Sequence, residues 1–444
     1  MTQGLDRRSF LQGSTAMGAG WLLTPSLWGQ DIAGKTEPIN VALIGVGDQG
    51  DTLMNTCLKM GDNSGIRFKA VCDLWEKLTL NRVARILKKY GHEVNAYVDY
   101  QAMLAQEKDL DAVIIATPDF CHADQTNACL KAGLHVYCEA PMSHTLAGAR
   151  SMVKTARETG KLLQIGFQRR SNPRYLHCWE NLINKAGILG RITAANAQWN
   201  RSARTDRGWS MRRLVPEDVL AKYGYNTMHE FRNWMWYRGL GSGPVALYGS
   251  HQIDIMNWFL ATHPKTVTAR GGTHYYEQKT HQWYDTVMAI LEYETSEGVV
   301  SATYQTVNSS GYGKRHEVFM GDQGSVEMSE GQVGIYREPE APDWEKWVKL
   351  GLLRPPNAPK PAVETATAVT INPSQRPASY QLPIDMTDPF AMPHLANFFA
   401  TIRGQAQLNC PPEVAYAATS TTLKINEAIE SQKSLTFSPE ELTV

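Results

Sequence analysis

The sequence has no surplus of charge of either sign and no cysteine pair with the spacing of a metal or redox motif. Among its 444 residues, 44 basic side chains balance 44 acidic ones, so we expect no nucleic-acid partner and no attachment to an anionic lipid surface. The seven cysteines are odd in number and fall mostly in apolar segments, where Cys behaves as a small buried hydrophobe. We therefore predict neither a disulfide framework nor a metal site.

An apolar run long enough for a permanent membrane span is also missing. Near the N-terminus, Arg7 and Arg8 precede a weakly apolar stretch, Gly13 to Trp28, that is too short to span a bilayer permanently. This order resembles a twin-arginine export signal; the alternative is a tail in which two arginines adjoin by chance. We expect residues 1–34 to be the signal, the twin-arginine export machinery to be a partner, and the mature protein to be periplasmic or otherwise exported.

The remaining chain is long enough for two domains. From residue 37 to 170, apolar strands alternate with helical stripes, which is typical of a parallel sheet covered on both faces. Residues 171–336 are richer in strands, with turn residues between them and few helices, which predicts an open, largely antiparallel sheet. The fold class is therefore α/β, with an N-terminal Rossmann domain and a C-terminal α+β domain.

Two further segments follow the second domain. Residues 337–393 contain eleven prolines and little periodicity, so we expect a long surface excursion and not a folded unit. Residues 394–444 return to helical patterning, and we expect these helices to pack back on the body of the protein.

A short apolar strand, Asn40 to Ile44, runs directly into three spaced glycines, and Asp51 to Met60 then has helical periodicity. Gly45 permits a tight turn, Gly47 lets the backbone approach a pyrophosphate, and Gly50 lets the helix pack against the strand. This order predicts a dinucleotide site. The alternative is a glycine turn in an α/β protein that binds no nucleotide.

A second strand, Ile66 to Asp73, ends in a carboxylate roughly 20 residues beyond the glycines, where an acidic side chain hydrogen-bonds the adenosine ribose. Because this carboxylate would repel a 2′-phosphate, we predict NAD as the cofactor in preference to NADP.

Six separated motifs occur in one order: ALIGVGDQG, VCD, ATPDFCHADQTNACLKAGLHVYCEAP, LLQIGFQRR, GSHQID and HLANFFATI. Together they resemble the Gfo/Idh/MocA oxidoreductases over nearly the whole mature chain. The resemblance implies a Rossmann domain, a C-terminal open-sheet domain, and hydride exchange between a nicotinamide and a sugar, polyol or related hydroxy compound. The cofactor contacts expected in this chain are Gly45, Gly47, Gln49, Gly50, Asp73, Thr117, Pro118, His122, Glu139 and Gln168.

The chain departs from the family pattern at two positions. Ala140 stands where the family usually has a lysine, and Leu247 stands where it usually has an aspartate, four residues before His251. His251 matches the histidine that resembles the substrate-facing acid/base. A hydride leaves a carbinol only as the hydroxyl proton leaves, so a proton acceptor must lie within hydrogen-bond reach. Either another residue has taken this role or ordinary alcohol oxidation is impaired.

We expect catalysis from His251, at the start of a helix over Ser250 to Leu260, and from Tyr248. Arg170 and Tyr175 belong to a polar cluster that offers further candidates. The expected substrate contacts are Arg169, Asn172, Trp199, Arg201 and Asp254. Aromatic faces beside planar donors, as in the segment 199–213, suit sugar rings. The structural alternatives are a helix-end hydrogen bond for His251, a core position for Tyr248, surface positions for the arginines, and a subunit interface for the segment.

Three functions are compatible with these residues. The first is an exported nicotinamide-dependent oxidoreductase for a small carbohydrate. The second is a glycosidase or lyase of the same fold, which oxidises and re-reduces its sugar through bound NAD. The third is a degenerate relative that binds a saccharide without turnover. We expect a homo-oligomer with tightly bound NAD, whose cleft is covered by the proline-rich excursion or by a neighbouring subunit's arm.

Overall fold

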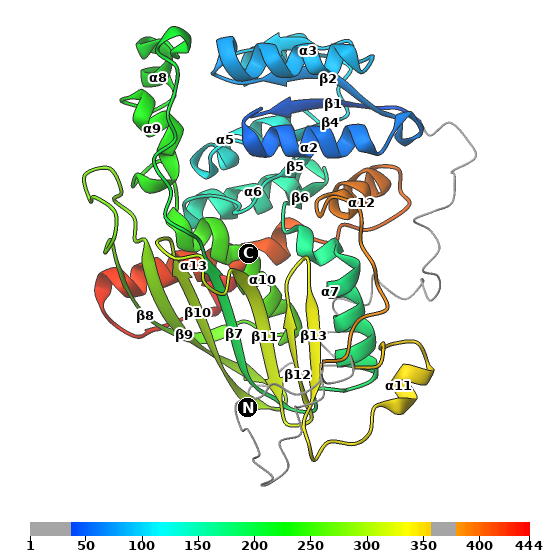
Figure 1. Cartoon of the computed structure of the whole chain (residues 1–444). Coiled ribbons are helices and arrows are strands. Elements are labelled where there is room, and N and C mark those ends of the chain that lie inside the picture. Colours follow the sequence, from blue (N-terminus) through cyan, green and yellow to red (C-terminus); the bar gives the residue numbers. More distant parts are fainter. Residues whose placement is uncertain (1–36, 357–378) are drawn as a thin grey trace, which may run out of the picture.

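The computed structural model describes residues 37–356 and 379–444. It consists of two domains stacked along the long axis of the molecule (Figure 1). The expected export signal and the centre of the proline-rich excursion lie outside the described residues. Within the described part of the chain, no helix is long and apolar enough to cross a membrane.

The first domain contains a six-stranded sheet in which every strand pair is parallel, in the order β3-β2-β1-β4-β5-β6. Its central strands β1 and β4 are apolar and almost entirely buried, because helices cover both faces of a sheet of this kind. The strands are Ile39–Ile44 (β1), Ile66–Cys72 (β2), Asn95–Tyr97 (β3), Ala112–Ile115 (β4), His135–Cys138 (β5) and Leu163–Ile165 (β6). The covering helices are Asp48–Lys59 (α2), Asn81–Lys89 (α3), Tyr100–Gln106 (α4), Asp119–Lys131 (α5) and Leu146–Thr159 (α6). The predicted Rossmann domain is confirmed.

The second domain contains an eight-stranded sheet in the order β13-β12-β11-β7-β10-β9-β8-β14. It is antiparallel except where β7 pairs in parallel with β10, so the sheet is mixed. The predicted α+β domain with a mainly antiparallel sheet is confirmed. The strands are Ile192–Asn200 (β7), Pro264–Gly272 (β8), Thr286–Thr295 (β9), Gly298–Val307 (β10), Arg315–Gly321 (β11), Gly324–Met328 (β12), Val333–Arg337 (β13) and Leu435–Thr436 (β14).

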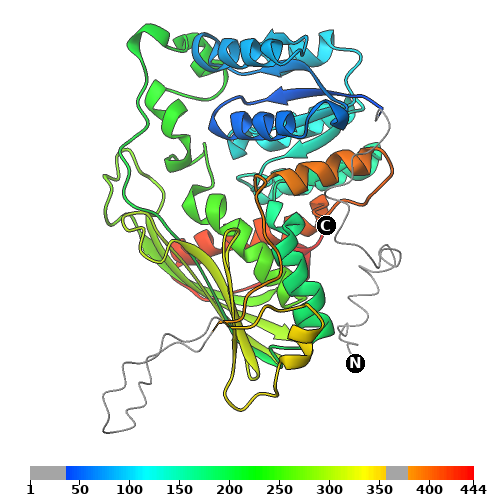
Figure 2. The same cartoon turned by 45° about the vertical axis from the view of Figure 1, so that its right-hand side comes forward.

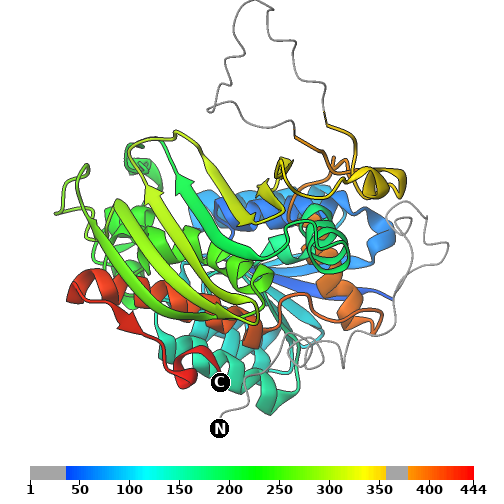
Figure 3. The same ribbon diagram turned by 90° about the horizontal axis from the view of Figure 1, so that it is seen from below.

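Helices cover only one face of this second sheet. Residues along β9 alternate strictly between buried and exposed, as expected for a sheet with one solvated face. The exposed face includes Met288 and Ile290, with 56% and 54% of their surfaces accessible. Figure 3 shows these strands from below, in front of the first domain. The helices on and around the covered face are Pro173–His177 (α7), Ser250–Phe259 (α10), Pro412–Ser431 (α13) and Pro439–Leu442 (α14).

The C-terminal part of the chain packs on both domains. Helix Met392–Ile402 (α12) buries Leu395, Phe398 and Phe399 in the core of the first domain beside β1 and α2. Helix α13 runs between the two domains, where Tyr416 is fully buried. The two domains are therefore held together by a segment that follows both of them in sequence.

The sequence underestimated the helical content after residue 187. Helices Glu217–Lys222 (α8) and Met228–Asn233 (α9) lie in an insertion between β7 and α10. This insertion rises along the side of the first domain (Figures 1 and 2). Each helix has only six residues, so its hydrophobic pattern is too short to identify from the sequence.

The expectation that residues 337–393 form no folded unit is corrected for their described part. Helix Glu345–Lys349 (α11) follows β13, and Trp344 before it is buried against Tyr380. Isolated bridges pair Ile335 with Tyr380 and Arg354 with Gln381. Both flanks of the excursion are thus attached to the edge of the second sheet.

Candidate functional site

A cavity of about 570 Å³ lies between the two domains. One wall consists of the carboxyl ends of the parallel strands, where ligands bind in sheets of this type. The opposite wall comes from β7, the insertion after it, and α10. Thirteen of the predicted site residues line the cavity: Gly45, Gly47, Gln49, Asp73, Thr117, Pro118, His122, Glu139, Gln168, Trp199, Arg201, Tyr248 and His251.

The glycine turn fits a dinucleotide. Gly45 has a φ of +83°, and a Cβ there would lie 2.7 Å from the Ala116 carbonyl oxygen. A Cβ on Gly50 would lie 1.9 Å from the Gly45 carbonyl oxygen, so Gly50 serves helix packing and does not line the cavity. A Cβ on Gly47 would meet nothing within 4 Å. The open side of Gly47 and the uncapped N-terminus of α2 therefore leave room and free N–H groups for a phosphate.

Asp73 is held by the protein on both carboxylate oxygens. Oδ2 accepts a hydrogen bond from the Val46 backbone N–H at 2.8 Å. Oδ1 accepts from the Trp75 N–H at 2.7 Å and from the Thr79 hydroxyl at 2.9 Å. Asp73 thus fastens the glycine turn to the end of β2. Oδ2 accepts only the one hydrogen bond from Val46 among the described residues, so it can accept a second one from a ribose hydroxyl, as expected.

The predicted residue His122 connects two loops in the wall of the cavity. The ring nitrogens of His122 lie 2.8 Å from the Thr117 carbonyl oxygen and 2.9 Å from the Pro141 carbonyl oxygen. Burial opposes a charged ring, but Cys138, Asp119 and the Pro141 carbonyl raise the pKa of His122 to about 9. His122 therefore joins the turns that follow β4 and β5 and shapes the wall.

Glu139 is a buried carboxyl group of the cavity whose pKa lies near neutral pH. Burial raises its pKa to about 7, although Gln49 donates to Oε1 at 2.8 Å and the Ala140 N–H donates to Oε2 at 3.1 Å. Ala140 itself lines the cavity, as does Leu247. The two positions that depart from the family pattern are therefore apolar surface within the site, and Glu139 is an ionisable group beside one of them.

His251 lies in the cavity wall, but not at a helix start. A π-helical turn, Val245–Gly249, runs into α10 without a break, so the expected position of His251 at the start of a helix is corrected. Burial, and after it the Arg169 guanidinium, lowers the pKa of His251 to about 3. Nδ1 is buried without a hydrogen-bond partner among the described residues. His251 is therefore a neutral imidazole in the cavity wall.

Three side chains form a stack beside this imidazole. The rings of Trp199 and Tyr248 are stacked with centroids 5.3 Å apart, and Trp199 lies 6.0 Å from the ring of His251. The guanidinium carbon of Arg201 lies 4.5 Å from the centroid of Tyr248. Aromatic faces next to planar donors are the surface that the sequence predicted for a sugar ring.

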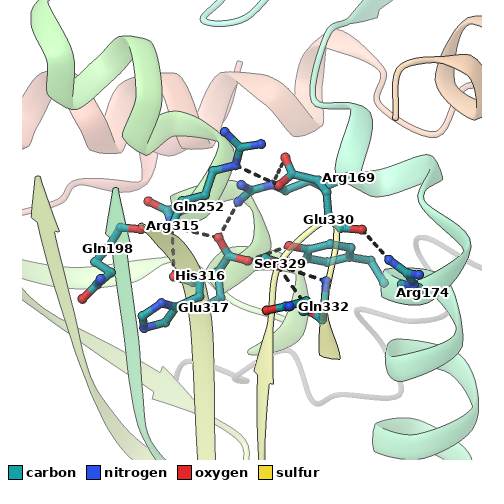
Figure 4. Close-up of polar contacts among 11 residues, drawn as sticks. Arg169, Arg174, Gln198, Gln252, Arg315, His316, Glu317, Ser329, Glu330 and Gln332 are labelled. Carbon is teal, nitrogen blue, oxygen red and sulfur yellow. Dashed lines mark hydrogen bonds and ion pairs between the residues drawn. The ribbon is translucent and has the colours of Figure 1, made fainter. Parts of the chain in front are cut away.

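Arg169 is not a substrate contact. Its side chain is buried and forms ion pairs with Glu317 and, at 3.0 Å, with Glu330. Arg315 donates to the other Glu330 oxygen at 3.2 Å, and Tyr175 donates to Glu317 at 2.7 Å. Figure 4 shows this buried network on β11 and the turn after β12. The surface position considered for Arg169 is thus also excluded, and only Arg315 and Glu330 reach the cavity.

The expected substrate contacts of Asn172 and Asp254 are corrected as well. Asn172 is buried and caps α7 by accepting the Arg174 N–H at 2.9 Å. Asp254 is buried and pairs with Arg170 at 2.8 Å, and it does not line the cavity. The three-residue spacing predicted that Asp254 lies near His251 on one helical face. In the structure the Asp254 carboxylate instead forms an ion pair with Arg170.

The insertion after β7 supplies cavity residues that sequence reasoning did not identify. The Trp75 indole N–H donates to the Arg213 carbonyl oxygen at 2.5 Å, and Arg207 pairs with Asp48 at 3.1 Å. Arg232 lies over the Trp75 ring at 4.9 Å and lowers the pKa of Asp73, which burial raises. The insertion therefore closes one end of the cavity. Only the cluster of arginines in 201–213 hinted at it in the sequence.

A glycine turn and a free imidazole that share one cavity define a dinucleotide-binding protein of the Rossmann class. Comparison with known proteins specifies the family. A model described as an oxidoreductase family with an NAD-binding Rossmann fold matches residues 39–167. A model described as the GFO/IDH/MocA C-terminal domain matches residues 182–327. The two models cover more than half of the chain, which belongs to the Gfo/Idh/MocA oxidoreductase family.

Individual relatives are more distant. A glycosyl hydrolase family 109 protein of Shewanella amazonensis is 30% identical over 55% of this chain and 55% of its own length. An inositol 2-dehydrogenase of Salmonella paratyphi B is 29% identical over 52% of this chain and 56% of its own length. The chain thus spans little more than half the length of these curated relatives. A levoglucosan dehydrogenase solved with NADH is 16% identical, with a TM-score of 0.66 over 90% of this chain and 99% of that one, which shows the shared fold.

Proposed function

We propose that this protein is an exported, nicotinamide-dependent oxidoreductase that acts on a sugar, a polyol or a sugar derivative. The observation that carries the proposal is that the glycine turn, His251 and the stacked rings of Trp199 and Tyr248 line the same cavity. The similarity to relatives that include an inositol 2-dehydrogenase and a D-glucoside 3-dehydrogenase supports the substrate class.

The chain's own residues perform four tasks in this proposal. The turn at Gly47 and the N-terminus of α2 hold the cofactor phosphates, and a sugar lies against the edges of the stacked Trp199 and Tyr248 rings in the cavity wall. A bound nicotinamide supplies the hydride acceptor. His251, neutral and without a partner on Nδ1, accepts the hydroxyl proton of the substrate. In this proposal His251 carries out the proton transfer that the lysine and the aspartate perform elsewhere in the family. Glu139 is a second ionisable group in the cavity.

A second candidate function is a glycosidase or lyase that uses the redox step internally. Two observations favour it: Ala140 and Leu247 present apolar surface where the family usually has ionisable groups, and one relative is named a glycosyl hydrolase family 109 protein. A carboxyl group whose pKa lies near neutrality, as Glu139 has, suits proton transfer to a leaving group. A third candidate, binding without turnover, follows if none of these groups transfers a proton.

One experiment separates the three candidates. The purified protein is incubated with a panel of sugars and glycosides while the absorbance of reduced nicotinamide and the sugar products are both followed. A net change in reduced cofactor supports the oxidoreductase. Cleaved product without a net change supports the glycosidase or lyase. Binding with neither change contradicts both enzymatic functions.

We expect the protein to bind NAD more tightly than NADP, because the Asp73 carboxylate repels a 2′-phosphate. Replacing Asp73 by Ser should weaken NAD binding by about 10–100-fold, the range for a hydrogen bond to a charged group, and should narrow the difference between the cofactors. Titration calorimetry with both cofactors measures this. Since Asp73 also holds the Val46 N–H, Asp73→Asn is the control that keeps an acceptor. Tighter NADP than NAD binding by the unmodified protein, through Arg232, would refute the preference.

We also expect NAD to remain bound throughout the catalytic cycle, because an exported enzyme meets no pool of free dinucleotide. The insertion that closes the cavity supports this, since its Val215, Leu220 and Met228 pack against Trp75. The sequence predicted that the proline-rich excursion or a neighbouring subunit covers the cleft. Of the described residues of the excursion, only Phe390 lines the cavity. Mass spectrometry of the supernatant of acid-denatured protein, purified without added cofactor, should detect stoichiometric NAD. Empty protein that requires millimolar NAD would show that the cofactor is not retained.

A homo-oligomer remains part of the proposal. Three large apolar side chains, Met288, Ile290 and Val299, are exposed on neighbouring strands of the uncovered face of the second sheet and are candidates for a subunit contact.

A further inference from the structure

The cavity contains a cation without a counter-ion. Six carboxylates line it, and each of them is already engaged: Asp48 by Arg207, Asp73 by the Val46 and Trp75 N–H groups, Asp119 by Ser242, Asp206 by His229 and His281, Glu139 by Gln49, and Glu330 by Arg169 and Arg315. The Arg201 guanidinium has no ion pair and no hydrogen-bond acceptor within the described ranges 37–356 and 379–444. In the part of the chain that the structure describes, the hydrogen bond of Arg201 is made by its backbone, from its N–H to the Val307 carbonyl oxygen at 2.8 Å.

This cation is partly removed from water. Arg201 is only partly exposed, and its guanidinium lies over the face of Tyr248. Burial, together with the neighbouring Arg204 and Arg207, lowers the pKa of Arg201 to about 10. A guanidinium has five N–H donors in a planar fork that matches a carboxylate or a phosphate. A partly desolvated arginine among other arginines is costly unless an anion joins it.

Arg201 lies at the end of a row of side chains that leads to His251, the proposed proton acceptor. Arg201 stacks on Tyr248, Tyr248 stacks on Trp199, and Trp199 lies beside His251. A sugar that lies along the edge of this stack in the cavity therefore has the imidazole toward one end and the unpaired guanidinium toward the other. Arg315, another cation in the wall, is already paired with Glu330. Among the described residues, Arg204 and Arg232 also line the cavity without an ion pair. Arg204 is exposed, however, and Arg232 lies over Trp75 and donates to the Gly208 carbonyl oxygen at 3.3 Å, so Arg201 is the partly buried cation that has neither partner.

We infer that the substrate carries a negatively charged group, a carboxylate or a phosphate, and that Arg201 binds it. This inference rests on the proposed function, because it assigns the substrate class of the same cavity. It excludes neutral sugars as the preferred substrates and selects sugar acids or sugar phosphates.

The same anion would assist His251. Arg169 and Arg315 both lower the pKa of the imidazole. A negative group bound at the Arg201 end reduces the positive potential in the cavity, which raises the pKa of His251 toward a range in which it is a stronger base. An anionic substrate thus increases the basicity of the group that takes its proton.

Titration calorimetry of the protein with its cofactor bound tests the inference. The probes are matched pairs: glucuronate and glucose, galacturonate and galactose, and glucose 6-phosphate and glucose. At least one acidic member should bind about 10-fold or more tightly than its neutral partner, and the difference should shrink at high salt, as expected for an ion pair. Preference for the uronates assigns a carboxylate, and preference for glucose 6-phosphate assigns a phosphate.

Two variants make the test specific. Arg201→Gln should abolish the preference for the acidic member while the dissociation constant of NAD stays unchanged. Arg212→Gln is the matched control, because Arg212 belongs to the same segment but does not line the cavity, and it should keep the preference. Equal or absent binding of both members of every pair, or a preference that survives Arg201→Gln, would overturn the inference. A weaker NAD affinity in Arg201→Gln with the preference intact would assign Arg201 to the cofactor.

These outcomes differ from failure of the proposed function. Preferential binding of acidic sugars without any product or reduced cofactor would refute the enzymatic function and keep the anion site. Turnover that is equal for neutral and acidic sugars would refute the anion site and keep the enzymatic function.

Discussion

Replacing His251 by Ala is expected to lower the rate of the chemical step by roughly 10²–10⁴-fold, the usual contribution of a positioned general acid or base. The reason is that Ala140 and Leu247 cannot accept a proton, so the imidazole is the principal acceptor beside the aromatic stack. The affinity for NAD should stay largely intact, because His251 lies on α10 and not on the glycine turn. Single-turnover kinetics with a substrate found by the sugar panel, together with NAD titration, measures both quantities.

His263→Ala provides a matched control for this variant. His263 is also a mostly buried histidine whose Nδ1 has no partner among the described residues, and burial lowers its pKa to about 4. It does not line the cavity, so turnover should remain near that of the unmodified protein. Unchanged turnover in His251→Ala would return His251 to a structural role. Loss of turnover in both variants would point to destabilisation and not to catalysis.

The pH dependence follows from the same environment. Since the pKa of His251 is lowered to about 3, the imidazole is neutral throughout the physiological range, and the rate should show no titration at the usual histidine pKa near 6.5. An acid limb centred near 6.5 would indicate that another group transfers the proton.

Arg169→Met should produce the largest loss of stability, about 3–5 kcal/mol, which is typical of breaking a buried ion pair from one side. The variant leaves Glu317 buried with neutral donors only, from Tyr175 and Gln252, and leaves Glu330 with Arg315 alone. Equilibrium denaturation in urea measures the change. The control is Arg157→Met, because the Arg157–Glu413 pair is about half exposed, and exposed pairs contribute less than about 1 kcal/mol. Equal losses in the two variants would contradict a special role for the buried network.

Because of this network, we also expect the free energy of unfolding to decrease at acidic pH. Burial opposes ionisation of Glu330, but Arg169 and Arg315 lower its pKa to about 2. Because the pKa in the folded state lies below that of the unfolded chain, this carboxylate stabilises the fold fully above the usual glutamate pKa of about 4.3 and loses its effect as the pH falls toward 2. The difference in unfolding free energy between the unmodified protein and Arg169→Met should therefore narrow over that interval. A difference that does not vary with pH would exclude Glu330 as its source.

Several features of the site were visible in the sequence because they depend on local chemistry. The spacing of Gly45, Gly47 and Gly50 after an apolar strand predicted the turn, since only glycine tolerates the positive φ at Gly45 and the close backbone contacts at Gly45 and Gly50. Asp73 was recognised at the end of the next strand, and the order of six motifs predicted the family.

Other residues were misjudged because their environment comes from distant parts of the chain. Arg169 and Asp254 were expected at the substrate, but Glu317, Glu330 and Arg170 neutralise them in the interior. His251 was placed at a helix start because a π-helical turn has no sequence signature that separates it from a loop. The helices of the insertion were missed because each is only six residues long.

The sequence by itself determined the α/β class, the parallel sheet, the glycine turn and the family, because strand and helix periods, glycine spacing and motif order are local properties. Only the tertiary structure decided which ionisable groups are paired and which remain free. Pairing depends on contacts between residues more than a hundred positions apart, such as Arg169 with Glu317. The neutral His251, the buried arginine network and the unpaired Arg201 are all consequences of that long-range pairing.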